Sequence, residues 1–194
     1  MAMTPVDPHK VQFTGENSFL RLKATEDGPD TTTCSHWRSF FSPGGPGTVL
    51  FVQSDATDGQ VKIYSDNPAF TRWVQELEAG MRAQFSNTSD PIIEATFARS
   101  GDYRSTYGEI VDSADGRIQL SWGDIREPFF IRFEPGNDIT GDWGVYSNLI
   151  PAWDCSLDVA GRKATGSTFG EVIAGHPASI SCLAWGESWL QGPR

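Results

Sequence analysis

The sequence predicts a mainly β protein: an antiparallel β-barrel of the calycin or lipocalin type, or a β-sandwich, with one amphipathic helix at about residues 68–85. Many short segments of alternating apolar and polar residues follow one another along the 194-residue chain, separated by glycine, proline and aspartate. This pattern is typical of an all-β domain. Only one segment repeats its apolar residues at helical spacing, so we expect a single helix beside the sheet.

The helix is predicted from its start signal and its apolar stripe. Asn67 is a good N-cap, and Pro68 suits the first helical position because no backbone donor is needed there. The apolar residues that follow recur one helical turn apart, and the stripe should pack on a sheet. These residues are Phe70, Trp73, Val74, Leu77 and Met81.

The remaining chain divides into strands within one domain. Residues 1–10 are polar and interrupted by proline, so we expect a disordered arm followed by a single domain over residues 11–194. Residues 11–24 predict a strand or a strand pair broken near Gly15, and His36–Phe41 predicts another strand. The segments "TVLFVQ" and "VKIYS" predict a hairpin.

Between residues 92 and 134 the pattern predicts a meander of four strands. A two-residue turn at Gly101-Asp102 would place Glu94 opposite Glu109. Turns at 112–116 and 123–128 would complete the meander. With these registers the apolar residues fall on one face, as expected for strands with one buried side. They are Ile93, Phe97, Ile110, Ile118, Leu120, Trp122, Phe129, Ile131 and Phe133.

The opposite face of this meander supplies the candidate catalytic residues. Two rows of side chains cross it, and in a closed barrel they would line the cavity. One row is Glu94, Glu109, Gln119 and Arg132, and the other is Thr96, Tyr107, Ser121 and Phe130. The alternative is a solvated face with an ordinary Arg117–Glu134 ion pair. Facing glutamates are unfavourable on an idle surface, which favours a chemical role.

Two carboxylates at neighbouring positions ionise unequally in a poorly solvated site, so one acts as an acid beside a base. We therefore expect Glu94 and Glu109 to share acid and base work. Arg132 would stabilise negative charge, and Tyr107 would donate a proton.

Other side chains are candidates for ligand binding. Asp124 and Arg126 lie in the charged loop "GDIREP" near the expected barrel mouth, although such loops are usually only solvated. His36, next to Trp37, is the best-placed histidine, although a lone histidine is more often structural.

Composition excludes several functional classes. The formal net charge of −10 disfavours nucleic acid and anionic membranes. No segment approaches the roughly 20 apolar residues of a membrane span, and the first residues lack a secretory signal, so we expect a cytoplasmic protein.

Cys34, Cys155 and Cys182 have no paired spacing and predict buried free thiols. No histidine or cysteine spacing predicts a metal site, and no nucleotide or hydrolase motif occurs, so no cofactor is expected.

Three functions therefore compete. The first is a cofactor-independent enzyme of the lyase or isomerase type, which moves protons on a small, partly apolar molecule. The second is a binding protein for a hydrophobic or carbohydrate ligand, in which Trp37, Trp143 or Trp153 stacks on a sugar. The third is an interaction subunit, with a protein partner or a second copy of the chain on its sheet face.

Overall fold

The computed structural model describes residues 8–102 and 104–192. The predicted arm therefore falls mostly outside the described residues, because only its last residues, Pro8–Lys10, are described, and they form a 3-10 turn, η1. Two more 3-10 turns are η2 (Asp55–Thr57) and η3 (Ala83–Phe85), and the α-helix α1 covers Pro68–Met81.

Thirteen strands occur within the described residues. They are β1 (Val11–Lys23), β2 (Asp30–Phe41), β3 (Gly47–Ser54), β4 (Val61–Ser65), β5 (Ile92–Gly101), β6 (Thr106–Ser113), β7 (Gly116–Ile125), β8 (Phe129–Phe133), β9 (Trp143–Val159), β10 (Arg162–Lys163), β11 (Gly170–Ile173), β12 (His176–Ser179) and β13 (Cys182–Gln191).

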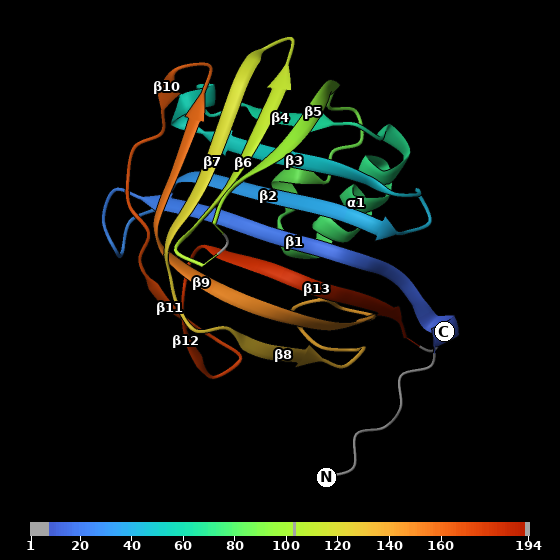
Figure 1. Cartoon of the computed structure of the whole chain (residues 1–194). Coiled ribbons are helices and arrows are strands. Elements are labelled where there is room, and N and C mark those ends of the chain that lie inside the picture. The colour runs from blue at the N-terminus through green and yellow to red at the C-terminus, as the bar shows by residue number, and fades with distance from the viewer. Residues whose placement is uncertain (1–7, 103, 193–194) are drawn as a thin grey trace.

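Nine of these described strands close a barrel in the order β9-β13-β1-β2-β3-β4-β5-β6-β7, and β7 pairs back to β9 (Figure 1). All neighbours are antiparallel except β4 and β5, which are parallel and joined by α1. A parallel pair needs a long crossover connection, and the helix supplies it. The structure thus confirms the predicted barrel with one helix.

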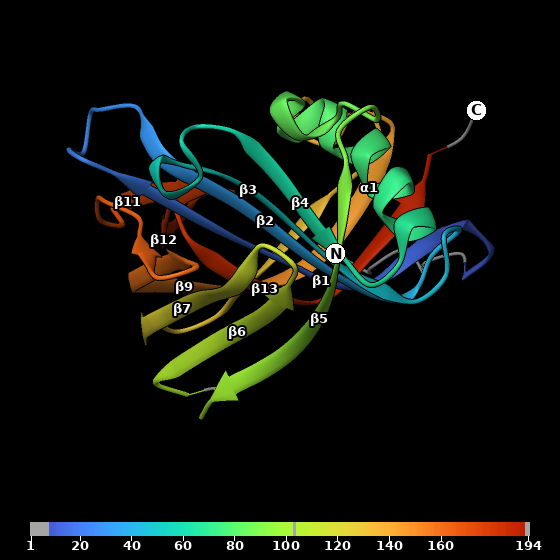
Figure 2. The same cartoon turned by 90° about the horizontal axis from the view of Figure 1, so that it is seen from above.

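The helix packs on the outside of the barrel wall. Figure 2 shows α1 on one side of the molecule and β5, β6 and β7 on the opposite side. Asn67 Oδ1 accepts hydrogen bonds from the backbone N–H groups of Ala69 and Phe70, which confirms the predicted N-cap. The predicted stripe forms an apolar cluster with the outward side chains of β1, β2 and β3, and Met81 rather than Phe85 ends the helix. This cluster includes Phe13, Trp37, Val49, Phe51, Phe70, Val74 and Leu77.

The barrel interior holds a second apolar cluster at one end. It contains Leu20, Leu22, Cys34, Leu50, Val52, Val111, Ile118, Leu120, Trp122, Leu157 and Leu183. Cys34, Cys155 and Cys182 are buried and free, as predicted. Side chains alternate along a strand. The side chains of Cys34 and His36 in β2 therefore point into the barrel, and that of Trp37 points outward under α1.

β5 and β6 pair antiparallel as predicted, but the predicted register is wrong. Arg99, and not Glu94, lies opposite Glu109, and Glu94 instead lies beside Ser65 of β4. The reason is the turn. Asp102 Oδ1 accepts hydrogen bonds from the backbone N–H groups of residues 104, 105 and 106, so the connection is longer than the two residues assumed.

β6 and β7 also pair as predicted but in a different register, and the predicted pairing of β7 with β8 is wrong. The turn between β6 and β7 is one residue shorter than expected, so Ile110 lies opposite Gln119 instead of Ile118. A one-residue slip exchanges the two faces of a strand, and Tyr107 and Glu109 therefore enter the interior. The predicted β7–β8 hairpin does not form, because β7 pairs with residues 152–159 of β9 and β8 pairs with residues 145–149.

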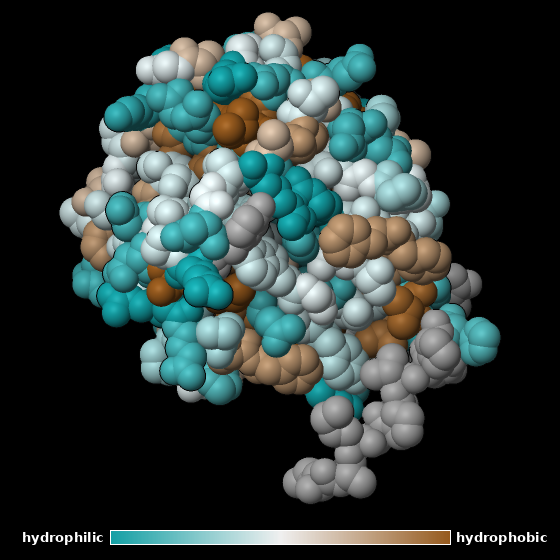
Figure 3. All heavy atoms as spheres, in the orientation of Figure 1, coloured by the Kyte–Doolittle hydropathy of each residue, from teal (hydrophilic) through white to brown (hydrophobic). Residues whose placement is uncertain are grey.

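The surface is mixed. The face in Figure 3 is largely hydrophilic, with small separate hydrophobic patches. Among the described residues, no helix has the length and apolar character needed to cross a membrane.

Candidate functional site

A group of polar side chains occupies the barrel interior beside the apolar cluster. We call it the Glu109 cluster, and it comprises Glu16, His36, Arg38, Arg99, Tyr107 and Glu109. Its members come from two pairs of consecutive strands, β1 with β2 and β5 with β6, and the two pairs are far apart in the sequence but meet across the barrel.

Glu109 is the most buried charged group of the cluster, with no exposed surface. Its Oε1 accepts a hydrogen bond of 2.5 Å from Arg38 Nη2, and its Oε2 accepts one of 2.9 Å from the Tyr107 hydroxyl. A buried carboxylate needs this kind of pairing, because an uncompensated charge is costly in the interior. Glu109 is therefore held in one orientation.

Glu16 links the cluster to the solvent. Both of its carboxylate oxygens lie 2.6 Å from Arg99 Nη2, and Oε2 lies 3.5 Å from Arg38 Nη1. Only 9% of the Glu16 side chain is exposed, against 34% for Arg99. The cluster is thus exposed to solvent at Arg99, and its inner end at Glu109 is fully buried.

The backbone of β1 and β2 explains how Glu16 enters the interior. The register of β1 against β2 and β13 shifts at Gly15, so a β-bulge changes the direction of the following side chain. A Cβ atom on Gly15 would lie 2.0 Å from the Arg38 carbonyl oxygen. Only glycine permits this approach, which brings Glu16 beside Arg38.

His36 lies at the bottom of the cluster and is 1% exposed. Burial lowers the pKa of its imidazole to about 4, with Arg38 and Arg99 acting in the same direction and Glu109 opposing them. His36 is therefore neutral at pH 7. Its Nε2 lies 3.8 Å from Glu109 Oε2 and makes no hydrogen bond with any described residue.

Tyr107 closes the cluster on the apolar side. Burial and the neighbouring Glu109 carboxylate raise the pKa of its phenol, so it remains a proton donor. Its ring lies 5.7 Å from the Trp122 ring and 5.6 Å from the Trp185 ring, centroid to centroid. Aromatic walls therefore adjoin the charged groups, as in many ligand sites.

The cluster balances its charges. Two carboxylates and two guanidinium groups alternate, and neutral His36 and Tyr107 add no charge at pH 7. Two buried nitrogen atoms of the cluster, His36 Nε2 and Arg38 Nη1, have no hydrogen-bond partner among the described residues. Such atoms are costly unless a ligand or water pairs with them.

The structure brings together three of the residues predicted from sequence, Glu109, Tyr107 and His36. It separates the others from them. Glu94 and Thr96 are exposed on the outer face of β5, so the predicted Glu94–Glu109 pair does not form.

Arg132 and Phe130 also lie away from the Glu109 cluster, because β8 is outside the closed ring of strands. The Arg132 guanidinium covers the Tyr146 ring at 5.3 Å and pairs with Glu134. Phe130 is 50% exposed. The predicted row that joined Arg132 to Glu109 is therefore wrong.

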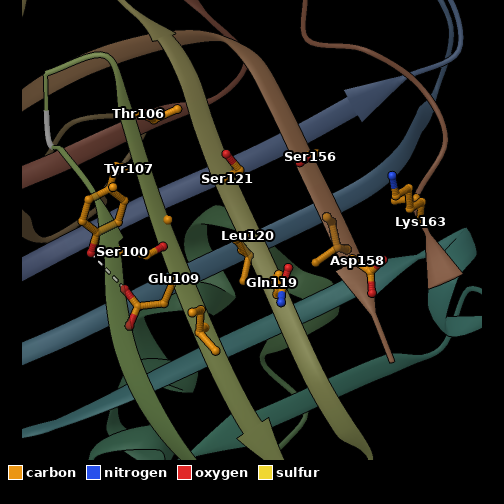
Figure 4. Close-up of a pocket in the computed structure, with 15 residues that line it drawn as sticks. Ser100, Thr106, Tyr107, Glu109, Gln119, Leu120, Ser121, Ser156, Asp158 and Lys163 are labelled. Atoms are coloured by element: carbon orange, nitrogen blue, oxygen red, sulfur yellow. Dashed lines mark hydrogen bonds between the residues drawn. The ribbon is translucent and has the colours of Figure 1, made fainter. Parts of the chain in front are cut away.

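Gln119 and Ser121 line a trough of about 450 Å³ over β6, β7 and β9, and Tyr107 and Glu109 are also among its lining residues. Figure 4 shows Ser121 with Ser156, Asp158 and Lys163 around this trough, and the hydrogen bond that joins Tyr107 to Glu109. Gln119 lies opposite Ile110 and Ser121 opposite Gly108, so their side chains do not share a face with that of Glu109.

The remaining predicted residues have other surroundings. Asp124 and Arg126 are exposed and form an ion pair of 2.6 Å. Trp37 is completely buried under α1, and its Nε1 donates to Glu78 Oε1 at 2.8 Å. Trp37 therefore points away from the barrel interior.

Sequence reasoning missed Arg38, Arg99 and Glu16. A signal existed for Arg38, because residues two apart on a strand share a face and Arg38 follows His36 at that spacing. Glu16 depends on the bulge at Gly15, and Arg99 depends on the length of the β5–β6 turn.

Two more buried carboxylates lie outside the barrel wall. Glu78 of α1 accepts hydrogen bonds from Ser35 and Trp37 and pairs with Arg82 at 3.2 Å. Glu187 of β13 accepts hydrogen bonds from Asn17 and Trp189, and burial raises its pKa to about 7.

Among the described residues, no three or more histidine, cysteine, aspartate or glutamate side chains are placed to hold a metal ion together. Comparison of the chain with protein-family models, with curated proteins and with solved structures found no match. Geometry and chemistry alone therefore bear on function.

Proposed function

We propose that the barrel binds a small, partly apolar molecule that carries a carbonyl oxygen, at the Glu109 cluster. The observation that carries this proposal is the pair of unsatisfied buried atoms, His36 Nε2 and Arg38 Nη1. Burying such groups without partners costs free energy, and a ligand oxygen that accepts from Arg38 would recover part of it.

The surroundings support a ligand with both polar and apolar parts. The charges of the cluster cancel, which favours a neutral polar group over an ionised one. The rings of Tyr107, Trp122 and Trp185 adjoin the cluster and suit an apolar body. Access would come from the Arg99 side, because about one-third of the Arg99 side chain is exposed.

Binding is tested with two matched probes, acetophenone and ethylbenzene, which share an apolar body and differ in the carbonyl. Titrations followed by the indole N–H signals of Trp122 and Trp185 in NMR spectra should show saturable binding of acetophenone. We expect at least about tenfold weaker binding of ethylbenzene, because one hydrogen bond is lost.

Two variants locate the binding. His36→Leu removes the unsatisfied nitrogen and should weaken the binding of acetophenone severalfold. Trp153→Ala, on the barrel exterior, should leave it unchanged. Thermal unfolding of each variant verifies the fold. Equal binding of both probes, or no saturable binding of either, would refute the proposal.

A second candidate is proton-transfer catalysis on such a carbonyl compound, as the lyase or isomerase hypothesis requires. It is favoured by one contact set: Glu109 Oε2 accepts from the Tyr107 hydroxyl and lies 3.8 Å from His36 Nε2. The Glu109 carboxylate would act as the base and remove a proton from the carbon next to the carbonyl, and Arg38 would stabilise the enolate oxygen. Where a C=C bond adjoins the deprotonated carbon, the protonated base would return the proton to the far carbon of that bond, and the double bond would move next to the carbonyl, which completes an isomerisation.

This candidate is tested by exchange of the methyl protons of acetophenone for deuterium in D2O, measured by NMR. Wild type should accelerate exchange above the buffer rate, and Glu109→Gln should remove the acceleration. Glu94→Gln, on the outer face, should retain it. If wild type gives only the buffer rate, catalysis is rejected and binding stands on its own test.

A further inference from the structure

A second candidate site lies on the outside of the barrel, where β9 changes partners. Residues 145–149 of β9 pair with β8, and residues 152–159 pair with β7. The connection between β7 and β8 runs alongside β9 at this junction, and a groove of about 750 Å³ opens beside it. We call it the Trp153 groove. Its walls include Trp153, Phe129, His176, Arg126 and Glu127.

The shape of the groove is set by rigid residues. Pro128, Pro151 and Pro177 also line it. Pro151 falls between the last partner of β8 and the first partner of β7, where its missing N–H costs no ladder hydrogen bond on that side. Arg126 N donates to the Pro151 carbonyl at 2.9 Å, which holds the connection between β7 and β8 against β9. The groove is thus preformed.

Aromatic rings form two of its walls. Trp153 is 37% exposed, whereas the other six tryptophans, all within the described residues, are buried or partly buried. Its six-membered ring lies against Gly170, where a Cβ atom would come within 3.1 Å of Cη2. On the other side the rings of Phe129 and His176 stack at 4.7 Å with an angle of 16° between their planes.

The rim of the groove is charged but not basic. Arg126 pairs with Asp124 at 2.6 Å, and Glu127 adds a further negative charge. Together with the net charge of −10, this arrangement disfavours an anionic ligand. A wholly apolar ligand would desolvate Arg126 and Glu127 without pairing them. A neutral ligand rich in hydroxyl groups meets both requirements.

We propose that the Trp153 groove binds a neutral pyranose sugar. The C–H face of the sugar ring would stack on Trp153, as apolar surfaces commonly pack on indole rings. Its hydroxyl groups would donate to the Glu127 carboxylate and accept from the Arg126 guanidinium, both charge-assisted hydrogen bonds. The site is separate from the Glu109 cluster and does not depend on the function proposed for that cluster.

The test uses four neutral probes and one anionic probe: methyl β-D-glucopyranoside, methyl α-D-mannopyranoside, N-acetyl-D-glucosamine, cellobiose and D-glucuronate. Each is titrated into the full chain while the Trp153 indole N–H signal is followed by NMR. We expect saturable binding of at least one neutral sugar, and binding of glucuronate at least about tenfold weaker than that of the neutral sugar.

Variants separate stacking from a general effect on the fold. Trp153→Ala should weaken sugar binding at least about tenfold, and Trp153→Phe should restore part of it because an aromatic face remains. Phe130→Ala is the matched control, since Phe130 is an exposed aromatic residue on neighbouring β8 that does not line the groove. His36→Leu, in the barrel interior, should also leave sugar affinity unchanged.

Three results would overturn the proposal. The first is that no neutral sugar shifts the Trp153 signal. The second is that glucuronate binds more tightly than the neutral sugars. The third is that decaproline binds and the sugars do not, which would make the groove a peptide site. Trp153→Ala is the control for ligand binding at the Glu109 cluster, and His36→Leu is the control for sugar binding at the Trp153 groove. The two proposals can therefore fail independently of each other.

Discussion

Arg99 lies directly opposite Glu109 in the β5–β6 ladder, yet its guanidinium pairs with Glu16 across the barrel. Arg38 completes the arrangement by contacting both carboxylates. The four charges therefore alternate in sign from the solvent to the interior. Removing any one of these four side chains takes at least one ion-pair partner from a neighbour.

Glu109 should be important for stability as well as for ligand binding. Glu109→Ala leaves the Arg38 guanidinium without its closest partner in a nearly dry site, which costs about 3–5 kcal/mol. Glu94→Ala removes an exposed carboxylate and should change the free energy of unfolding by less than about 0.5 kcal/mol. Urea denaturation at pH 7 measures both, and the double variant should show additive effects because the two side chains are not paired. Strong coupling would mean that the β5–β6 register is different.

Glu187 predicts a loss of stability as pH rises. Burial raises its pKa from 4.5 to about 7, so the folded state holds a proton that the unfolded state has released between these values. The free energy of unfolding should fall across this window, by at most about 3 kcal/mol from this group. Glu187→Gln retains an oxygen for Trp189 and should remove this fall.

The measurement for Glu187 is the difference in unfolding free energy between the variant and wild type from about pH 4.5 to about pH 8, a range that spans both pKa values. The difference should grow with pH in favour of the variant. Glu76→Gln, exposed on α1, is the control and should show a constant small difference. A difference independent of pH would contradict the assignment.

His36 predicts the opposite trend at lower pH. Its pKa is lowered from 6.5 to about 4 by burial, aided by Arg38 and Arg99 and opposed by Glu109. The unfolded state therefore takes up a proton first as pH falls, and stability that is complete above pH 6.5 is lost toward pH 4. The nitrogen-15 shifts of the imidazole should show a neutral ring down to about pH 4. His36→Gln should lack this loss, and an imidazole that titrates near 6.5 would disprove burial in the cluster.

Two glycines should respond in opposite ways to alanine. Gly15→Ala places a Cβ atom 2.0 Å from the Arg38 carbonyl oxygen and must displace β1 from β2. We expect a loss of about 1–3 kcal/mol or more. Gly80 lies in α1, and a Cβ atom added there would meet no atom within 4 Å, so Gly80→Ala should gain up to about 1 kcal/mol. Thermal unfolding compares the two, and equal effects would contradict the close approach at Gly15.

Local signals in the sequence are sufficient for several elements. Asn67-Pro68 and the apolar stripe from Phe70 to Met81 predict α1 correctly, because capping and helical spacing act within a few residues. The hairpin of β3 and β4 is also predicted, and the alternating segments correctly indicate a barrel with one helix. All of these depend on neighbours close in the chain.

The candidate site is only partly predictable. The sequence points to Glu109, Tyr107 and His36, but a two-residue β5–β6 turn would make Glu94 the partner of Glu109, and the turn is not of that length. The side chain of Asp102 binds three backbone N–H groups and lengthens it. A turn of different length changes which side chains face each other, and no periodicity within a strand reveals it.

By itself, the sequence determined the strand and helix content, the helix and its cap, and the buried thiols, because these follow from propensities and apolar spacing over a few residues. Only the tertiary structure decided the ring closure of β7 with β9, the inward turn of Glu16 at the bulge, and the union of Glu16, Arg38, Arg99 and Glu109. The longest of these ion pairs joins Glu16 to Arg99, which are 83 positions apart in the chain. Such contacts depend on strand register and closure, which are set by the packing of the whole barrel.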